Sequence, residues 1–346
     1  MTGVWRHLQL LIIVLLPVFS VIPAGAEAAA GYHLIKNISV PGNGGWDYLA
    51  VDDAARRVYV SHGTEVDVLN ADSGKIAGKI PDLQGVHGIA IAPDLGRGFI
   101  SDGRANAVVI FDLKTLRTLK SVAAGKNPDA IVYEPVTNKV FAFNGGDGNA
   151  TVIDAAKGTA TGTIDLVGKP EFAVADGTGQ VFDNLEDKSE LLKIDARKKT
   201  VAERWTLAPG ESPSSMAIDR RNHRLFAGCH NRLLIVINSD NGKVITTLPI
   251  GDGVDATVFD PRTKLVMTTN GDGTLTVIHQ DTPDKYHVVE TVKTRKRSRT
   301  LTLDEKTHRL FIPAAQFAAE PAPTPDKPHV RPAIVPGSFS ILVFGR

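Results

Sequence analysis

Seven residues that recur along the chain at intervals of 40 to 44 carry side chains able to bind an ion or to transfer a proton. They are four carboxylates, one imidazole, one hydroxyl and one guanidinium: Asp47, His87, Asp129, Glu171, Ser214, Asp255 and Arg299. Carboxylate oxygens favour Ca²⁺ or Mg²⁺, and an added imidazole would suit a transition metal. Crowded carboxylates repel one another, so one of them could have a raised pKa and act as an acid or a base. The guanidinium could bind an anionic group of a substrate.

The spacing of these residues follows an internal repeat of about 42 residues. Each copy has a short run of small apolar residues, an aromatic-bearing run, an alternating run and a fourth run, with turns between them. Residues 129–134 and 140–144 are the first two runs of one copy. Four strands joined by hairpin turns are the unit of a propeller blade. Seven copies therefore predict an all-β fold, a single seven-bladed β-propeller of four-stranded antiparallel blades over residues 32–346.

The two ends of the repeat predict how the ring closes. The last copy has strands expected at 299–303, 309–312 and 340–344, and no fourth strand follows. A strand expected at 32–38 precedes the first copy and belongs to none. We expect it to pair with the C-terminal strand, which leaves no major sheet edge unpaired.

A propeller would gather the seven spaced residues around its axis. Strand direction alternates within a blade, so the loops before the first strands share a face with the loops between second and third strands. We call this the upper face, and the seven residues the axial ring. Hydrated polar residues without a catalytic role, or caps of local loop amides, are the alternative interpretations. The metal hypothesis uses five members of the ring: Asp47, His87, Asp129, Glu171 and Asp255.

Two further features would lie beside this ring. Trp46 could be a stacking platform for a sugar, a quinone or a base, or a packing residue under its loop. The run 293–299 has five basic residues in seven: Lys293, Arg295, Lys296, Arg297 and Arg299. Such a run could bind a polyanion, locally and with an affinity weakened by salt, or be a solvated loop.

The seventh copy also has a Pro-rich insertion at 314–336 between its second and third strands. Its composition favours extended, polyproline-like chain over helix. The insertion would leave from the upper face, where it could cover the opening as a lid or recruit a partner. A tolerated long loop is the alternative, because closing a long loop costs little additional entropy.

The first residues are typical of an export signal. Arg6 and His7 precede an apolar run that extends to Ile22, and Ala24-Gly25-Ala26 follows. A basic start, an apolar middle and an A-x-A exit predict a secretory signal peptide at 1–26, with cleavage as late as residue 30. The alternative is an N-terminal membrane anchor. After cleavage we expect no membrane span, and a periplasmic or secreted protein.

Composition excludes several classes of protein. The 346 residues include 39 Lys and Arg against 38 Asp and Glu, a formal net charge of +1. This argues against a surface wholly adapted to nucleic acid and against an acidic disordered chain. The single cysteine, Cys229, can form no intramolecular disulfide, and we expect it to be a small buried hydrophobe. The sequence has no G-x-S-x-G, HExxH or C-x-x-C-H motif.

Segments of the repeat resemble a known family. The second strands at 58–62 and 140–144 look like degenerate YVTN repeats, and the strand-and-turn segments 66–75 and 236–243 fit the same pattern. The whole mature chain resembles the YncE-like, YVTN-repeat seven-bladed propellers of the bacterial periplasm or cell surface. No copy has the full tetrapeptide, and residues 181–184 depart most. The resemblance implies a binding scaffold rather than a settled reaction.

Three functions follow as hypotheses. The first is a monomeric, non-enzymatic scaffold at the cell envelope that recognises an envelope protein, a glycan or a small ligand on its upper face. The second is a lactonase-like, gluconolactonase-like or lyase-like enzyme with a divalent metal, Ca²⁺ or Mg²⁺, on the axial ring, an analogy at the level of the fold. The third is an accessory protein of periplasmic quinoprotein oxidation, which only the family resemblance suggests.

Overall fold

The computed structural model of this chain describes residues 1–3, 31–42, 44–320 and 332–346. It divides into one unit of residues Met1–Ala30 and one of residues Gly31–Arg346, and every strand named below belongs to the second. The predicted signal peptide lies almost wholly outside the described residues. Among those that are described, no helix has the length and apolar character needed to cross a membrane.

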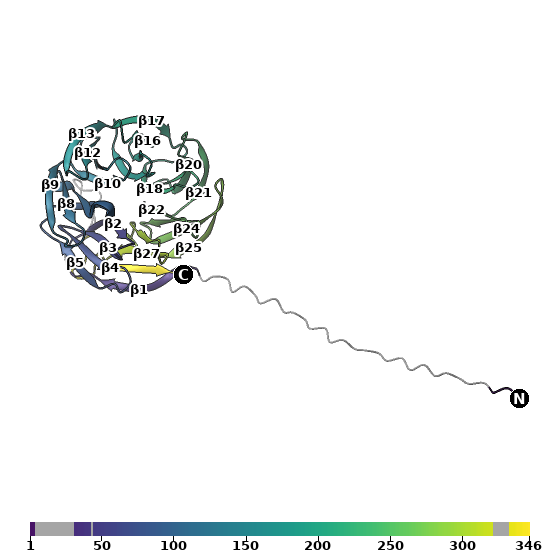
Figure 1. Ribbon diagram of the computed structural model, residues 1–346. Coiled ribbons are helices and arrows are strands. Elements are labelled where there is room, and N and C mark those ends of the chain that lie inside the picture. Colours follow the sequence, from purple (N-terminus) through teal and green to yellow (C-terminus); the bar gives the residue numbers. More distant parts are fainter. Residues whose placement is uncertain (4–30, 43, 321–331) are drawn as a thin grey trace. The chain divides into compact units, whose positions relative to one another are not determined.

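In the described part of the second unit, seven four-stranded antiparallel sheets form a ring of blades (Figure 1). Blade 1 contains β2 (Trp46–Asp52), β3 (Arg57–His62), β4 (Glu65–Asn70) and β5 (Ile76–Ile80). Blade 2 contains β6 (Val86–Ala92), β7 (Arg97–Asp102), β8 (Ala107–Asp112) and β9 (Thr118–Ala123), with the short 3₁₀ helices η1 (Pro93–Leu95) and η2 (Gly103–Ala105) in its turns. Blade 3 contains β10 (Pro128–Glu134), β11 (Lys139–Asn144), β12 (Asn149–Asp154) and β13 (Thr159–Asp165).

The next three blades repeat this order. Blade 4 contains β14 (Pro170–Ala175), β15 (Gln180–Leu185), β16 (Glu190–Asp195) and β17 (Thr200–Thr206). Blade 5 contains β18 (Pro213–Asp219), β19 (Arg224–Cys229), β20 (Leu233–Asn238) and β21 (Val244–Pro249). Blade 6 contains β22 (Val254–Asp260), β23 (Leu265–Asn270), β24 (Thr274–Thr282) and β25 (Lys285–Lys293). The predicted seven-bladed propeller is confirmed, with the first strand of each blade toward the axis (Figure 1).

Blade 7 joins the two ends of the propeller. It contains β26 (Thr302–Asp304), β27 (Arg309–Ala314), β28 (Ser340–Gly345) and, from the N-terminal side, β1 (His33–Ser39). The register of β1 against β28 extends from the pair His33–Gly345 to the pair Ser39–Ser340. The predicted closure by an N-terminal strand is therefore confirmed. The first strand of this blade is shorter than expected, since its ladder with β27 reaches only from Asp304 to Thr302.

An acidic residue at the end of most first strands has a structural role. The Asp52 carboxylate accepts a hydrogen bond from Ala55 N at 2.8 Å, and that of Glu134 accepts one from Thr137 N at 2.7 Å. Such short-range caps fix the tight turn into the second strand. The repeat thus places structural carboxylates at one end of the first strands, and the axial ring lies at the other end.

Aromatic residues of the second strands fill the spaces between blades. Tyr59, Phe99, Phe141, Phe182, Phe226 and Phe311 occupy the same position in their blades and are at most 2% exposed. Burying one such side chain contributes about 1.5–3 kcal/mol. The expectation for Cys229 is confirmed: it is buried among apolar side chains, and burial raises the pKa of its thiol to about 12.

Candidate functional site

Six members of the axial ring line one cavity of about 640 Å³ on the upper face, which we call the axial cup. The ring members come from the starts of the first strands, together with the residue three positions before β26. The cup is lined by Asp47, His87, Asp129, Glu171, Asp255 and Arg299, and also by Trp46, Tyr48, Arg104, Lys169, Glu186 and His230. Ser214 is not among the lining residues: it is fully buried, and its hydroxyl donates to the Val254 carbonyl at 2.6 Å.

One side of the cup holds a compact group of two carboxylates and an imidazole. His87 Nδ1 donates to Asp47 Oδ2 at 2.7 Å and lies 3.7 Å from Asp129 Oδ1. That Asp129 oxygen is buried and has no hydrogen-bond partner. Ligand atoms from these three residues lie close enough together to hold one metal ion. The structure thus brings together three of the five predicted metal ligands.

Burial and mutual repulsion govern the protonation of this group. Burial, followed by repulsion from Asp47, raises the pKa of Asp129 to about 7, although His87 opposes the shift. Burial disfavours the charged imidazole, but the hydrogen bond to Asp47 and the nearby Asp129 outweigh it, so the pKa of His87 is also raised. The group can therefore hold or release a proton near neutral pH.

The other two carboxylates have cationic partners of their own. Asp255 Oδ2 lies 3.0 Å from Arg299 Nε, and Glu171 Oε2 lies 3.2 Å from Lys169 Nζ. Burial raises the pKa of both carboxyl groups, against the effect of these cations. Among the described residues, neither carboxylate belongs to a group close enough to share one ion with His87.

An aromatic pair lies between the cup and a smaller axial cavity: Tyr48 lines both cavities, and Phe172 lines the smaller one. The rings of Tyr48 and Phe172 meet edge to face, with centroids 5.2 Å apart. Beneath them a separate cavity of about 150 Å³ is lined mostly by apolar side chains, including Ile131 and Val258. Burial and then the carboxylates of the cup, Asp129 first among them, raise the pKa of Tyr48 well above its usual value. The cup is therefore separated from the rest of the axis.

Sequence reasoning missed Tyr48, although the repeat contains a signal for it. The residue after each ring member is small in five copies: Gly88, Ala130, Ser215, Ala256 and Thr300. The two exceptions are Tyr48 and Phe172, which meet at the axis. Arg104, Glu186 and His230 were missed as well, and all three follow second strands on the upper face.

A second cavity of about 660 Å³, which we call the side pocket, adjoins the cup. The two share Gly45, Trp46, His230 and Arg299. The Trp46 ring stacks on Phe339, with centroids 5.3 Å apart, and lies 6.1 Å from the ring of Phe317. Trp46 thus packs against Phe339 and also lines both cavities, and its role as a stacking platform stays a prediction.

The basic residues of the run 293–299 lie in different environments. Lys296 and Arg297 line the side pocket, together with Arg299. The Arg297 guanidinium lies 5.4 Å from the Phe317 ring centroid and 2.6 Å from Glu320. Arg295 instead donates to the Ser340 hydroxyl at 3.4 Å, and Lys293 is an exposed residue of β25. Three of the five basic residues of the run therefore line a cavity.

The two ends of the Pro-rich insertion pair with each other beside the side pocket. Phe317 and Ile334 form an isolated antiparallel bridge, and Ala318 N donates to the Ala333 carbonyl at 2.9 Å. Phe317 and Ile334 thereby become part of the pocket wall. Residues 321–331 of the predicted insertion lie outside the described residues, and the lid hypothesis stays a prediction.

Similarity to known proteins is limited to the fold. No family model matches the chain, and neither does any curated protein. A chain of the mitotic checkpoint complex matches with a TM-score of 0.74 and 15% identity, over 97% of this chain and 99% of that one. The WD40 repeats of RRP9 match with a TM-score of 0.73 and 10% identity, over 92% and 98%.

A chain of hydrazine synthase from Kuenenia stuttgartiensis matches with a TM-score of 0.68 and 15% identity, over 79% of this chain and 94% of that one. At such identities a shared fold does not carry a shared activity. This chain is a seven-bladed β-propeller similar in structure to WD40-like propellers, and it is assigned to no family.

Proposed function

We propose that this protein is an exported, non-enzymatic binding scaffold of the YncE-like, YVTN-repeat type. Its ligand would be a small zwitterionic fragment of the cell envelope, a short peptide or an amino-sugar acid, bound on the upper face. One observation carries the proposal: two adjoining cavities differ in charge and share Trp46 and Arg299.

The charges of the two cavities favour a ligand with groups of both signs. The cup contains four ring carboxylates, and the imidazole of His87 lies within 4 Å of two of them, Asp47 and Asp129. A cationic group of a ligand would be attracted there. The side pocket is lined by Lys296, Arg297 and Arg299, with Asp252 as its acidic lining residue. Arg297 and Arg299 already pair with Glu320 and Asp255, so Lys296 would be the main contact of an anionic group. Charges of both signs at fixed positions give specificity more than raw affinity.

The shape of the site also supports binding. Cavities of about 640 and 660 Å³ lie within the range of small-molecule sites. Trp46 lies where they meet, with its ring held against Phe339, and could stack on a flat part of the ligand. The Tyr48–Phe172 pair closes the bottom of the cup.

The start of the propeller supports export by a cleaved leader. The second unit begins at Gly31, and Tyr32 is buried with its backbone N–H donating to Glu290 at 2.9 Å. Cleavage after Ala26 or Ala30 would leave these contacts intact.

The test is titration calorimetry with four matched forms of one aromatic tripeptide: zwitterionic, N-acetylated, C-amidated and capped at both ends. We expect saturable binding of the zwitterion and at least tenfold weaker binding of each capped form. Equal affinity for all four forms, or binding of none of them and of no amino-sugar acid, would contradict the proposal.

A second candidate is a metal-dependent hydrolase, which the unpartnered Asp129 oxygen beside His87 and Asp47 favours. Two carboxylates and one imidazole suit a transition metal better than Ca²⁺ or Mg²⁺. This candidate requires lactone hydrolysis that a chelator inhibits and that Asp129→Asn abolishes, while Asp112→Asn on an outer turn leaves it unchanged.

A further inference from the structure

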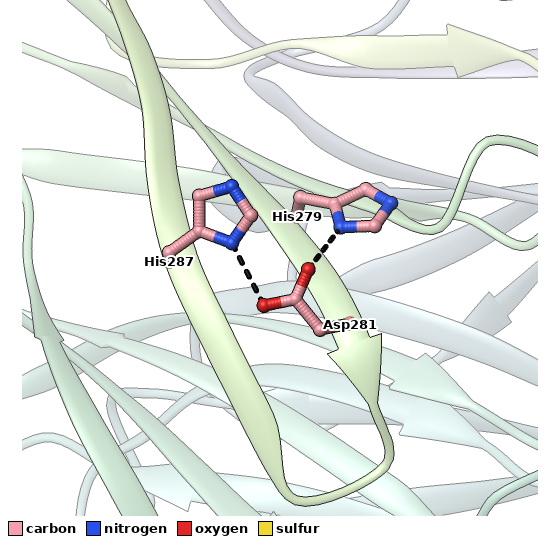
Figure 2. Close-up of side chains that lie close together, drawn as sticks. All are labelled: His279, Asp281 and His287. Carbon is pink, nitrogen blue, oxygen red and sulfur yellow. Dashed lines mark hydrogen bonds and ion pairs between the residues drawn. The ribbon is translucent and has the colours of Figure 1, made fainter.

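The outer hairpin of blade 6 brings two imidazoles and a carboxylate together on its surface (Figure 2). His279 in β24 lies directly opposite His287 in β25, with ring centroids 5.6 Å apart. Asp281 lies between them, and each imidazole Nδ1 is 2.8 Å from a different oxygen of its carboxylate. This group, which we call the hairpin triad, is separate from the axial cup and independent of the proposed function.

The hairpin is longer than its counterparts and is held in place from the inside. β24 and β25 have nine residues each, whereas the outer two strands of blades 1–5 have five to seven. Gln280 is buried, and its side-chain amide donates to Asp219 of blade 5 and to Tyr286, both at 3.0 Å. The turn is tied to blade 5 by Arg224, which lies 2.7 Å from Asp284. These contacts fix the backbone that carries the triad.

Strand alternation explains why the two histidines face outward. Successive side chains in a strand point to opposite faces. Because Gln280 and Tyr286 point inward against blade 5, their neighbours His279 and His287 point outward.

A local irregularity positions the carboxylate. The register passes from the pair Gln280–Tyr286 to the pair Thr282–Lys285, so Asp281 has no partner in β25. An extra residue of this kind forms a β-bulge, which re-aims its side chain. Here the side chain is aimed between the two imidazoles (Figure 2).

We propose that the hairpin triad binds a divalent transition-metal ion of the Zn²⁺, Cu²⁺ and Ni²⁺ class, through one nitrogen of each histidine and one oxygen of Asp281. The three ligand atoms lie within 4.8 Å of one another. Ligand bonds of about 2.0–2.2 Å to zinc therefore need only small side-chain rotations. All three side chains are exposed over a third or more of their surface, so an ion reaches them from solvent.

The chemistry of the donors sets the selectivity of the site. Imidazole suits Zn²⁺, Cu²⁺ and Ni²⁺, whereas Ca²⁺ and Mg²⁺ prefer oxygen ligands only. Among divalent ions of the first transition-metal row, Cu²⁺ binds most tightly to a given site of this type. Binding requires a free ring nitrogen on each imidazole, because a protonated nitrogen cannot coordinate a metal ion. A bound ion would join the two strands near the end of the hairpin.

The experiment titrates Zn²⁺ and Cu²⁺ into the full chain, prepared without a histidine tag, in a calorimeter. His287→Gln removes one ligand on the surface, and His223→Gln is the matched control. His223 forms an exposed pair with Asp240, also at 2.8 Å, without a second imidazole. We expect a saturable site that His287→Gln weakens at least tenfold and that His223→Gln leaves unchanged.

Electron paramagnetic resonance of the Cu²⁺-loaded protein supplies a second readout. The wild type should show coupling to two imidazole nitrogens, and His287→Gln coupling to one. Thermal unfolding in a chelator should be the same for both proteins, because His287 packs against no core cluster among the described residues. An affinity unaffected by His287→Gln, or the absence of saturable Zn²⁺ and Cu²⁺ binding, would overturn the proposal.

Discussion

Tyr48 of blade 1 and Phe172 of blade 4 meet across the axis of the ring, with ring centroids 5.2 Å apart and planes at 68°. Their contact converts an axial opening into a cup with a floor. At the same position the other five copies have only small residues, so one contact between two side chains separates the polar cup from the apolar cavity below.

Removing the floor should cost stability and join the two cavities. Tyr48→Ala deletes a buried aromatic ring, so we expect the free energy of unfolding to fall by about 3 kcal/mol. Tyr48→Phe keeps the ring and should lose less than half of that. Urea denaturation followed by circular dichroism measures both. Equal stability of Tyr48→Ala and the wild type would show that the floor does not contribute to the packed core.

The repeat explains why much of the fold could be predicted. A period near 42 residues predicts the number and order of the blades. The strand before the first copy, which belongs to no copy, predicts how the ring closes. Both predictions depend only on which strands pair through their backbones. The floor of the cup was not predicted, because it is formed by Tyr48 and Phe172, the two residues that differ from the small residue found at this position in the other copies. Ser214 occupies a ring position, yet its side chain turns to the Val254 carbonyl of the next blade. Side-chain orientation of this kind depends on tertiary neighbours that a repeat pattern does not specify.

Asp129 should make stability depend on pH. Its pKa of about 7 exceeds the unfolded value of about 3.9, so the folded state binds its proton more tightly. The stability that this proton provides is complete below about pH 4 and is lost as the pH rises through about 7. The groups around Asp129 are Asp47, Glu171, His87 and Lys169.

Asp129→Asn should therefore be more stable than the wild type at pH 8, by about 2–4 kcal/mol, because a pKa of about 7 in place of about 3.9 corresponds to about 4 kcal/mol at most. The gain should vanish at pH 4. Asp112→Asn is a control whose effect on stability should change with pH in the opposite direction, because hydrogen bonds from Thr115 lower the pKa of Asp112. Denaturant titrations at the two pH values measure the difference. A gain for Asp129→Asn that is larger at pH 4 than at pH 8 would contradict this account.

Arg56 and Asp304 should connect blades 1 and 7 independently of the closing strand. Two hydrogen bonds of 2.8 and 2.6 Å join the guanidinium to a carboxylate that is fully buried. Arg56→Gln leaves that charge without its partner, which costs about 3 kcal/mol. Lys157→Gln breaks only an exposed pair with Asp154 and should cost less than about 0.5 kcal/mol.

The pH dependence of Arg56→Gln follows from the same contact. Burial works against the charged form of Asp304, yet the hydrogen bonds from Arg56 and Thr307 prevail and its pKa is lowered. This stability is present above the unfolded pKa and is lost as the pH falls below it. The difference in the free energy of unfolding between Arg56→Gln and the wild type should thus become smaller below about pH 4. A difference that widens in acid would show that the pair is not the cause.

The predicted leader gives a direct biochemical expectation. Expressed in a bacterial host, the protein should be recovered outside the cytoplasm with an N-terminus at Glu27, or as late as Gly31. N-terminal sequencing of the fractionated protein measures this. An intact Met1 terminus in the membrane fraction would favour the N-terminal anchor instead.

We propose that the axial cup and the side pocket act as one site. The most direct test is to titrate the zwitterionic tripeptide and its two singly capped forms into three variants. Asp129→Asn alters the cup, Lys296→Gln alters the side pocket, and Lys157→Gln alters neither. We predict that Asp129→Asn weakens only forms with a free amino group and Lys296→Gln only forms with a free carboxylate, each at least fivefold. Equal affinities of all three variants for every form would contradict the proposal.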